Sequence, residues 1–369
     1  MKAKIGVEAT PLSDEPTGVG NYVYYLLEAL IELAPSYHFF LYAPQKTQPI
    51  ERFRRFPNVS IRYHRFLAVS EVLWAQITMA CMCWKDKIDL FWGTTQAFPL
   101  FFRKKQRHLL TIYDFTYRLF PQTTSRVRGG FMRLFSKQIY RKADCRMAIS
   151  QGTAERLKTL YHIKADEVVI PPLKEGLRPL PQSELRPLLN KYQLDYKNYL
   201  LMVGTLEPRK NMVPTLDIYG SLLANQDLLP LVLVGKKGWR DDSIQQKIHK
   251  LQEKYPNKLR LLGYVDDQEL IGLISGARFY LMPSLYEGYG MPIAEARSCG
   301  TSVICSDVPE MVEAAEEDGI FLSLERFEKD LTKGLTLKNC STVAKCHYPS
   351  KQALASIILD RIKYLLMQR

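Results

Sequence analysis

Short runs of aliphatic, β-branched and aromatic residues alternate along the chain with longer stretches in which apolar residues recur every three or four positions. The short runs predict strands, and the longer stretches, such as 22–33 and 212–223, predict amphipathic helices. The expected strands are 5–9, 39–43, 59–65, 90–92, 109–113, 145–149 and 168–170, then 199–203, 231–234, 258–262, 279–282, 302–305 and 320–323. Apolar strands that alternate with helices indicate an α/β fold with two doubly wound parallel sheets.

A proline-rich stretch marks the boundary between the two domains. Five prolines fall between residues 171 and 198: Pro171, Pro172, Pro179, Pro181 and Pro187. So many prolines argue against a regular element there. We expect a Rossmann-like domain over 1–180, a second over 181–350, and a C-terminal amphipathic helix over 351–369.

Composition and cysteine content limit the classes of protein to which the chain can belong. The chain has 369 residues, of which 46% are hydrophobic and 24% charged, as in ordinary folded proteins, so a disordered or fibrous chain is excluded. The longest mostly apolar run, Trp74–Trp84, is far shorter than the roughly 20 residues of a membrane span. No signal peptide is expected, and the seven cysteines indicate reduced thiols, so the expected location is cytoplasmic.

Positive charge is concentrated in the first half of the chain. The net charge is +13, and residues 101–150 alone carry 12 basic and 2 acidic side chains. Nucleic acid, anionic lipid and phosphorylated substrates are all candidate partners for such a surface. A nucleic-acid-binding protein is therefore an alternative, although no recognisable binding motif accompanies the basic residues.

The stretch Ser284–Gly300 is the strongest constellation of chemistry-bearing residues. A strand ends before it, a turn with Gly288 and Gly290 follows, and Pro292 suits a helix start. Glu287 on the loop and Glu295 on the helix can then point into one cleft, beside amides of the helix start.

A second loop, Val203–Asn211, follows the first strand of the second domain. Gly204 opens the turn, and Arg209 and Lys210 stand beside the start of the next helix. Two adjacent cations at such a position suit a diphosphate.

The Glu-x7-Glu spacing of Glu287 and Glu295 resembles retaining nucleotide-sugar glycosyltransferases of the GT-B fold, glycosyltransferase family 4. The overall pattern, especially Thr17–Tyr22 with the Tyr113–Asp114 region, resembles the mannosyltransferase-like branch of that family. The resemblance implies two Rossmann-like domains facing a central cleft, with acceptor binding in the first and nucleotide-sugar binding in the second. It also implies that the C-terminal helix over 351–369 crosses back to the first domain. It also implies that Glu287 contacts the sugar hydroxyls, Glu295 the ribose, and Arg209 and Lys210 the diphosphate. The implied donor-binding residues are Gly18, Gly20, Gly204, Thr205, Arg209, Lys210, Glu287, Gly288, Tyr289, Gly290, Met291 and Glu295.

The match in the first domain is weaker. Gly18 and Gly20 lie in the segment Thr17–Tyr22, which resembles the family's glycine loop that faces the donor. Relatives often carry His-Asp where this chain has Tyr113 and Asp114. Asp114 joins Glu287, Arg209 and Lys210 in the expected catalytic set, and Tyr113, which can donate a hydrogen bond, is expected on the acceptor side.

No cofactor and no metal are expected. The chain has no Asp-x-Asp triplet of the kind that holds a metal on a sugar diphosphate, and its six histidines show no ligand spacing. Arg209, Lys210 and helix-end amides would then stabilise the leaving group.

The basic region 126–146 has helical spacing. Arg133, Lys137 and Arg141 step along one face, whereas the apolar residues Phe131, Leu134, Phe135 and Ile139 fit the other. A basic amphipathic helix can lie on an anionic membrane, so contact with the inner face of the plasma membrane is expected as an alternative to an ordinary solvated helix.

The resemblance and the residues together predict a metal-independent, retaining hexosyltransferase of cell-surface polysaccharide or lipopolysaccharide synthesis. Its partners would be a nucleotide sugar, with GDP-mannose expected first, and a saccharide or lipid-linked acceptor, with no nucleic acid. A UDP-sugar transferase, a GT-B epimerase and a non-catalytic sugar-nucleotide-binding protein remain open as alternatives.

Overall fold

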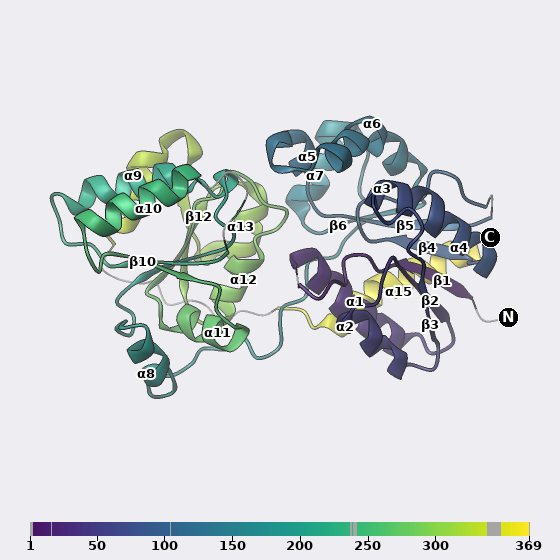
Figure 1. Ribbon diagram of the computed structural model, residues 1–369, viewed down its shortest axis with the longest axis horizontal. Helices are drawn as coiled ribbons and strands as arrows, with labels where there is room; N and C mark the ends of the chain where they lie inside the picture. Colours follow the sequence, from purple (N-terminus) through teal and green to yellow (C-terminus); the bar gives the residue numbers. More distant parts are fainter. Residues whose placement is uncertain are drawn as a thin grey trace. The chain divides into compact units, whose positions relative to one another are not determined.

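The protein divides into two compact units (Figure 1). The computed structural model describes residues 3–15, 17–103, 105–236, 238, 242–337 and 348–368. Unit 1 comprises Met1–Pro172 and Pro349–Arg369, and unit 2 comprises Leu173–Tyr348. Two successive segments of unit 1 are thus separated in the sequence by the whole of unit 2.

The boundary between the units lies a few residues before the expected one at 180. The backbone after Pro172 belongs to unit 2 because it is tied to it by polar contacts. The Nζ of Lys174 lies 2.6 Å from Oδ1 of Asp267, and the carbonyl of Arg178 accepts a hydrogen bond from Ser275.

Unit 1 is built on a parallel sheet, seven-stranded in the described residues, with the order β3-β2-β1-β4-β5-β6-β7. Its strands are β1 (Lys4–Glu8), β2 (His38–Ala43), β3 (Val59–Tyr63), β4 (Leu90–Gly93), β5 (Arg107–Ile112), β6 (Cys145–Ala148) and β7 (Glu167–Val168). Its helices are α1 (Gly18–Leu33), α2 (Gln48–Glu51), α3 (Glu71–Leu73), the π-helix η2 (Trp74–Met79), α4 (Ala80–Asp86), α5 (Thr116–Leu119), α6 (Arg126–Lys142), α7 (Gln151–Tyr161) and α15 (Lys351–Met367).

Unit 2 has a second parallel sheet, six-stranded in its described part, with the order β10-β9-β8-β11-β12-β13. The strands are β8 (Leu200–Val203), β9 (Leu231–Val234), β10 (Leu259–Gly263), β11 (Phe279–Met282), β12 (Ser302–Ser306) and β13 (Ile320–Leu322). The helices are α8 (Gln182–Lys191), α9 (Met212–Leu223), α10 (Asp242–Lys254), α11 (Asp267–Gly276), α12 (Met291–Ser298), α13 (Pro309–Ala315) and α14 (Phe327–Leu335). The thirteen expected strands all appear, each within two residues at either end, which confirms two doubly wound sheets.

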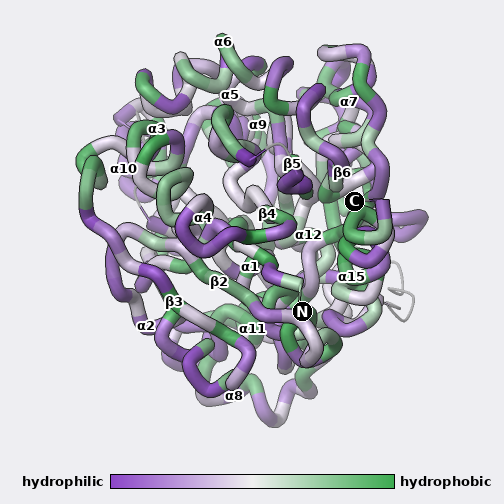
Figure 2. Tube along the Cα trace, turned by 90° about the vertical axis from the view of Figure 1, so that its right-hand side faces the viewer, coloured by the Kyte–Doolittle hydropathy of each residue, from purple (hydrophilic) through white to green (hydrophobic). Residues whose placement is uncertain are grey.

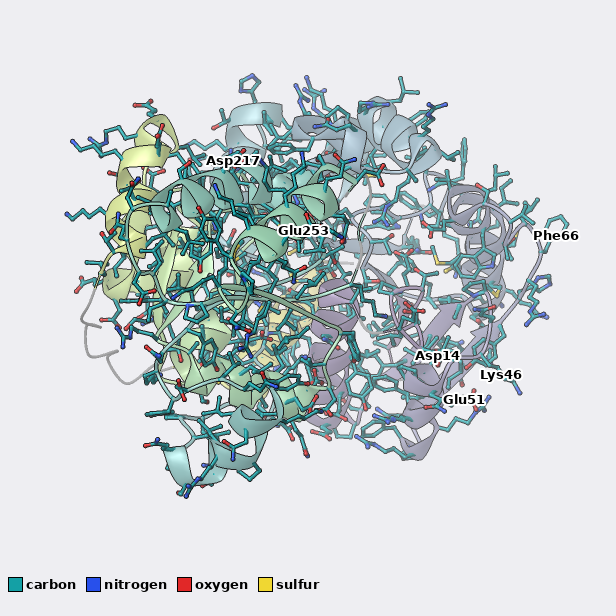
Figure 3. The ribbon with its side chains drawn as sticks, turned by 60° about the vertical axis from the view of Figure 1, so that its left-hand side comes forward. Asp14, Lys46, Glu51, Phe66, Asp217 and Glu253 are labelled. Carbon is teal, nitrogen blue, oxygen red and sulfur yellow. The ribbon has the colours of Figure 1, made fainter. Side chains whose placement is uncertain are left out.

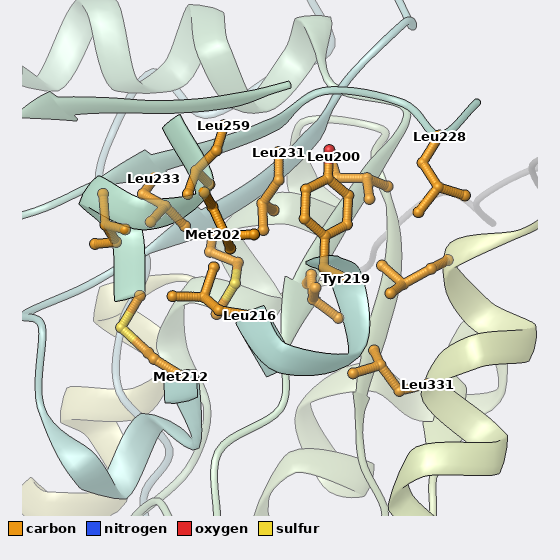
Figure 4. Packing of buried hydrophobic residues seen from close by; sticks show 14 of the residues in the cluster. Leu200, Met202, Met212, Leu216, Tyr219, Leu228, Leu231, Leu233, Leu259 and Leu331 are labelled. Atoms are coloured by element: carbon orange, nitrogen blue, oxygen red, sulfur yellow. The ribbon is translucent and has the colours of Figure 1, made fainter. Parts of the chain in front are cut away.

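The core of unit 2 shows why these strands form (Figure 4). Alternate residues of a strand point to the same face, and here that face is apolar in every neighbouring strand. Leu200 and Met202 of β8 pack with Leu231 and Leu233 of β9 under Tyr219 of α9. Side chains from α10 and α14 complete the same buried cluster. Each fully buried aliphatic side chain contributes about 1.5–3 kcal/mol, so packing fixes the sheet in place.

Two expectations about local structure need correction. Helix α1 begins at Gly18 rather than near 22, because the hydroxyl of Thr17 accepts a hydrogen bond from the Gly20 amide (3.0 Å) and caps the helix there. The proline-rich stretch contains a regular element, α8, with Pro187 inside it. Leu185 and Leu189 of α8 are buried, and α8 packs against α11, so tertiary packing outweighs the lost backbone hydrogen bond.

In both sheets the strand order reverses beside the first strand. In unit 1 the reversal falls between β1 and β4, and in unit 2 between β8 and β11. Loops after two such strands leave the sheet in opposite directions and open a crevice at the carboxyl ends. Each unit therefore offers one place where a ligand is expected to bind.

Candidate functional site

The two loops that carry the expected donor site meet at the switch point of unit 2. The loop after β8 contains a short 3-10 turn, Pro208–Lys210, and the loop after β11 leads into α12. The amide of Leu285 donates to the carbonyl of Arg209 (2.9 Å), which joins the loops directly. Gly204 has φ +141°, and a Cβ there would lie 3.3 Å from Cε of Lys210. The glycine thus lets the lysine lie against the end of β8.

Glu287 is held by both expected cations. Its Oε1 lies 2.7 Å from Nζ of Lys210, and its Oε2 lies 2.7 Å from Nη1 of Arg209. The other side of the Arg209 guanidinium contacts Glu207 at 2.5 Å. All four side chains are between 13% and 20% exposed, so the cluster is partly shielded from water yet reachable. Two cations and two carboxylates face one another without net charge.

Glu287 and Glu295 have different electrostatic surroundings. Burial tends to raise the pKa of Glu287, but the charges and hydrogen bonds of Lys210 and Arg209 outweigh it and lower the pKa to about 2. Burial raises the pKa of Glu295 to about 7, with a smaller opposing effect from Lys174 and a smaller reinforcing one from Asp267. Near neutral pH, one carboxylate is fully ionised and the other is close to half protonated.

The turn before α12 depends on Gly290. Its φ is +109°, and a Cβ there would approach the methyl group of Ala314 to 3.2 Å. The helix begins at Met291, so Pro292 occupies the second helical position rather than the expected first. Tyr289 is buried, Gly288 and Met291 are partly exposed, and all three expected donor-site residues lie in or directly after this turn.

A small pocket of about 20 Å³ adjoins the cluster. Gly204, Thr205, Lys210 and Ser284 are among its lining residues. The buried Ser284 hydroxyl has no hydrogen-bond partner in the described residues, and the volume suits about one water molecule. Sequence reasoning assigned no role to Glu207, Ser284 or Lys174. Glu207 and Ser284 lie in the two loops, but neither the contact of Glu207 with Arg209 nor the burial of Ser284 could be read from the sequence.

The expected residues of the first half lie in unit 1. Gly18 and Gly20 form the first turn of α1, and a Cβ on Gly20 would lie 2.6 Å from the carbonyl oxygen of Pro11. Tyr113 is buried after β5 and packs edge-on against Tyr22, with ring centroids 5.3 Å apart. The Asp114 carboxylate accepts a hydrogen bond from the Thr116 amide (2.8 Å) at the start of α5.

The basic helix is present as α6, with one change from expectation. Arg133, Lys137 and Arg141 are all exposed, as the spacing predicts. Leu134, expected on the opposite, apolar face, is 78% exposed and stands among the basic residues. Ile139 is buried as expected and shares the inward face with Met132, Ser136 and Tyr140, whereas Phe131 and Phe135 are partly buried. Hydrophobic and hydrophilic residues alternate closely along this helix (Figure 2).

Two further properties concern the described residues as a whole. No helix among them is both long enough and apolar enough to cross a membrane. In the same part of the chain, no three His, Cys, Asp or Glu side chains are grouped so that they could hold a metal ion.

Family models match both halves of the chain. Residues 16–172 match the model described as Glycosyltransferase Family 4, and residues 189–335 match Glycosyl transferases group 1. O-antigen chain mannosyltransferase B of Escherichia coli is 33% identical over 218 residues, which cover 58% of this chain and 57% of that protein. The serotype-specific mannosyltransferase WbdA of Escherichia coli is 29% identical over 191 residues, which cover 49% of this chain and 23% of that protein. The chain thus spans about half or less of the length of these relatives.

Solved structures share the fold over nearly the whole chain. HepE of Anabaena, crystallised with UDP and glucose, aligns with a TM-score of 0.69 at 16% identity and covers 100% of both chains. WaaG, a glycosyltransferase involved in lipopolysaccharide biosynthesis, aligns with a TM-score of 0.64 at 16% identity over 95% and 93% of the two chains. The chain therefore belongs to the glycosyltransferases of the GT-B fold, with a first half of Glycosyltransferase Family 4 and a second half of Glycosyl transferases group 1.

Proposed function

We propose that the protein transfers a hexose from a nucleotide-diphosphate sugar to a saccharide or lipid-linked acceptor during synthesis of O-antigen or a related surface polysaccharide. Mannose from GDP-mannose is the proposed donor, because the relatives in Escherichia coli are mannosyltransferases. The observation that carries the proposal is the convergence of Arg209 and Lys210 on Glu287 at the switch point of unit 2. Cations at this place suit a diphosphate, and a carboxylate beside them suits sugar hydroxyls.

The proposed reaction proceeds with retention and without a metal. The bond from the anomeric carbon to the diphosphate oxygen breaks, and a bond to the acceptor oxygen forms on the same face of the sugar. The acceptor proton passes to the departing diphosphate, whose charge Arg209 and Lys210 stabilise. Glu287 positions the sugar, and Glu295, with its raised pKa, is proposed to contact the ribose hydroxyls. Asp114 is proposed to act from the acceptor side.

Turnover with defined donors tests this proposal. The purified chain is incubated with a synthetic mannose-terminated acceptor and either GDP-mannose or UDP-glucose, with and without EDTA. Product forms from GDP-mannose, keeps the anomeric configuration of the donor, and is unaffected by EDTA. The double variant Arg209→Ala/Glu295→Ala forms none. A product with inverted configuration would overturn retention, and loss of activity in EDTA would overturn metal independence. Full activity of the double variant would overturn the roles given to Arg209 and Glu295.

A second proposal concerns the inner face of the plasma membrane. Arg133, Lys137 and Arg141 on α6 carry positive charge, with exposed Leu134 among them. Helix α3 packs beside α6, and the segment around α3 and η2 exposes four more apolar side chains: Phe66, Val69, Leu73 and Ile77. Phe66, labelled in Figure 3, is 61% exposed. Basic and apolar side chains side by side suit an anionic bilayer surface, where a lipid-linked acceptor would be found.

A further inference from the structure

The loop after β4 contains a buried residue with a strained backbone. Gln96 has φ +62°, in the left-handed region that residues with a side chain rarely adopt, and it is only 6% exposed. Among the non-glycine residues with positive φ in the described part of the chain, only Gln96 and Asn211 are buried. Asn211 ends the proposed donor loop. Such strain persists only where surrounding contacts fix it, and it concentrates at functional sites, so the contacts of Gln96 indicate what the strain serves.

Three consecutive residues tie this loop to the neighbouring strands β1 and β5. The hydroxyl of Thr94 donates to the carbonyl of Glu8 (2.6 Å), the last residue of β1. Thr95 donates to the buried carboxylate of Glu8 through its amide (3.2 Å) and its hydroxyl (2.8 Å). The side-chain Nε2 of Gln96 donates to the backbone carbonyl of Asp114 (2.8 Å), two residues after β5. The loop therefore connects the carboxyl ends of β1, β4 and β5.

Asp114 is held by donors to its backbone and to its side chain. Its carbonyl accepts from Gln96, and its carboxylate accepts from the Thr116 amide (2.8 Å). The preceding carbonyl, that of Tyr113, accepts from the hydroxyl of Thr153 of α7 (3.3 Å). The contact with Gln96 fixes the peptide group next to the Asp114 side chain, so it limits the directions in which the carboxylate can point.

The amide of Gln96 is held in turn by a network of buried hydroxyl groups. A backbone carbonyl only accepts hydrogen bonds, so the nitrogen rather than the oxygen of the Gln96 amide faces Asp114. The same nitrogen lies 3.4 Å from the hydroxyl of Tyr140 of α6. The hydroxyl of Tyr117 of α5 lies 2.9 Å from that of Tyr140 and 2.7 Å from that of Tyr161 of α7. Connected buried hydrogen bonds of this kind make the side chains that form them rigid.

We propose that Gln96 is a positioning residue of the transfer reaction, which holds Asp114 in the geometry that transfer requires. The inference rests on the proposed function, in which Asp114 acts from the acceptor side. Gln96 acts through the backbone of Asp114, and the proposed donor site lies in unit 2. Its loss should therefore lower kcat and leave the KM for the donor unchanged.

Three variants of the intact chain test this inference. Gln96→Leu removes the donor at similar size, and Gln96→Glu replaces the amide by a carboxyl group that titrates. Asn58→Leu is the matched control, because Asn58 is a buried residue of unit 1 whose side-chain amide also donates to backbone carbonyls, those of Ala34 and Tyr37. Asn58 precedes β3, whereas Gln96 follows β4, so in a parallel sheet they lie at opposite edges.

The measurements are kcat and KM with GDP-mannose and a mannose-terminated acceptor between pH 5.5 and pH 8. Hydrogen exchange of the peptide 113–119 is recorded by mass spectrometry without substrate. Wild-type exchange in the rest of unit 1 shows that a variant is folded.

Gln96→Leu is expected to lower kcat about tenfold or more, with the KM for GDP-mannose within about twofold of the wild type. The kcat of Gln96→Glu, relative to the wild type, should rise about tenfold from pH 8 to pH 5.5, because a protonated carboxyl can donate to the Asp114 carbonyl and an ionised one cannot. Asn58→Leu should keep the wild-type kcat. The peptide 113–119 should exchange faster in Gln96→Leu than in the wild type and Asn58→Leu.

A wild-type kcat in Gln96→Leu would overturn the inference, as would an equal fall in Asn58→Leu. Wild-type exchange of the peptide 113–119 in Gln96→Leu would overturn it as well. A wild type that transfers no sugar, together with faster exchange of this peptide in Gln96→Leu, would overturn the proposed function and support the fixing of Asp114 by Gln96.

Discussion

The Nζ of Lys210 lies 2.7 Å from Oε1 of Glu287, although the two residues are 77 positions apart in the sequence. Arg209 holds the other oxygen of the same carboxylate. A single glutamate therefore sets the positions of both cations that we propose to receive the diphosphate. Its removal should disturb their geometry as well as any direct contact with the sugar.

Glu287→Gln is expected to lower kcat about a hundredfold, because misplacement of catalytic groups by about 1 Å can cost that much. GDP should still stabilise the variant, since both cations remain. The measurement is GDP release from GDP-mannose at saturating acceptor. Glu207→Gln is the matched comparison, because it leaves both contacts of Glu287 intact and should cost much less. Equal losses in the two variants would contradict this prediction.

Glu295 predicts a pH dependence of stability. Its pKa is about 7 in the folded protein and near the ordinary glutamate value of 4.5 when the chain is unfolded. Between these values the unfolded chain releases its proton first, so the contribution of Glu295 to stability is fully present below pH 4.5 and falls as pH rises towards 7. At about 1.4 kcal/mol per pKa unit, the loss amounts to about 3 kcal/mol.

Urea unfolding at pH 5 and pH 8 measures this loss. Glu295→Gln carries no titrating carboxyl, so its free energy of unfolding should fall less than that of the wild type over the same interval. Parallel changes in the two proteins would show that Glu295 does not titrate in this range.

Gly204→Ala is expected to weaken GDP binding about tenfold and to destabilise the fold by about 1–3 kcal/mol. The alanine would adopt a backbone conformation that is strained for it and would press on Cε of Lys210. The measurements are isothermal titration with GDP and urea unfolding. Gly130→Ala is the control, because a Cβ there meets no atom within 4 Å in α6 and should be neutral or stabilising. Normal GDP affinity in Gly204→Ala would remove the role given to this glycine.

The triple variant Arg133→Ala/Lys137→Ala/Arg141→Ala should bind anionic vesicles about a hundredfold more weakly at low salt. Each basic residue near such a surface contributes about 1 kcal/mol. Sedimentation with phosphatidylglycerol vesicles measures the partitioning, and Leu134→Ser should weaken it further. The control replaces Lys250, Lys254 and Lys329, three exposed lysines of unit 2, by alanine. If the control loses as much binding as the α6 variant, the attraction depends on net charge and not on this surface.

The strands and the two principal loops could be predicted from the sequence because both depend on local patterns. A buried strand such as Leu231–Val234 is apolar at every position, and the glycines near Arg209 and Glu287 mark turns. Pro187 was misleading because packing of Leu185 and Leu189, which is not a local property, outweighs its effect on the helix.

The contacts between individual side chains, including those between residues far apart in the sequence, could mostly not be predicted from the sequence. Glu207 lies in the loop Val203–Asn211, but its contact with Arg209 depends on side-chain geometry. Glu8 ends a strand like any other residue until the chain has folded and Thr95, 87 positions later, donates to it. Leu134 was assigned to the wrong face because its spacing fits both a buried stripe and an exposed one.

The last helix completes the unit that the first residues begin. Helix α15 lies beside α1 (Figure 1), and Lys351 pairs with Glu28, 323 positions earlier, at 2.8 Å. During synthesis on the ribosome, unit 1 cannot close this interface until residues 351–367 have emerged, after all of unit 2. The nascent chain therefore keeps an apolar face of α1 uncovered for most of its translation. Molecular chaperones are expected to bind this apolar face of α1 while the chain is being synthesised. Unit 2 is expected to reach its native state before unit 1.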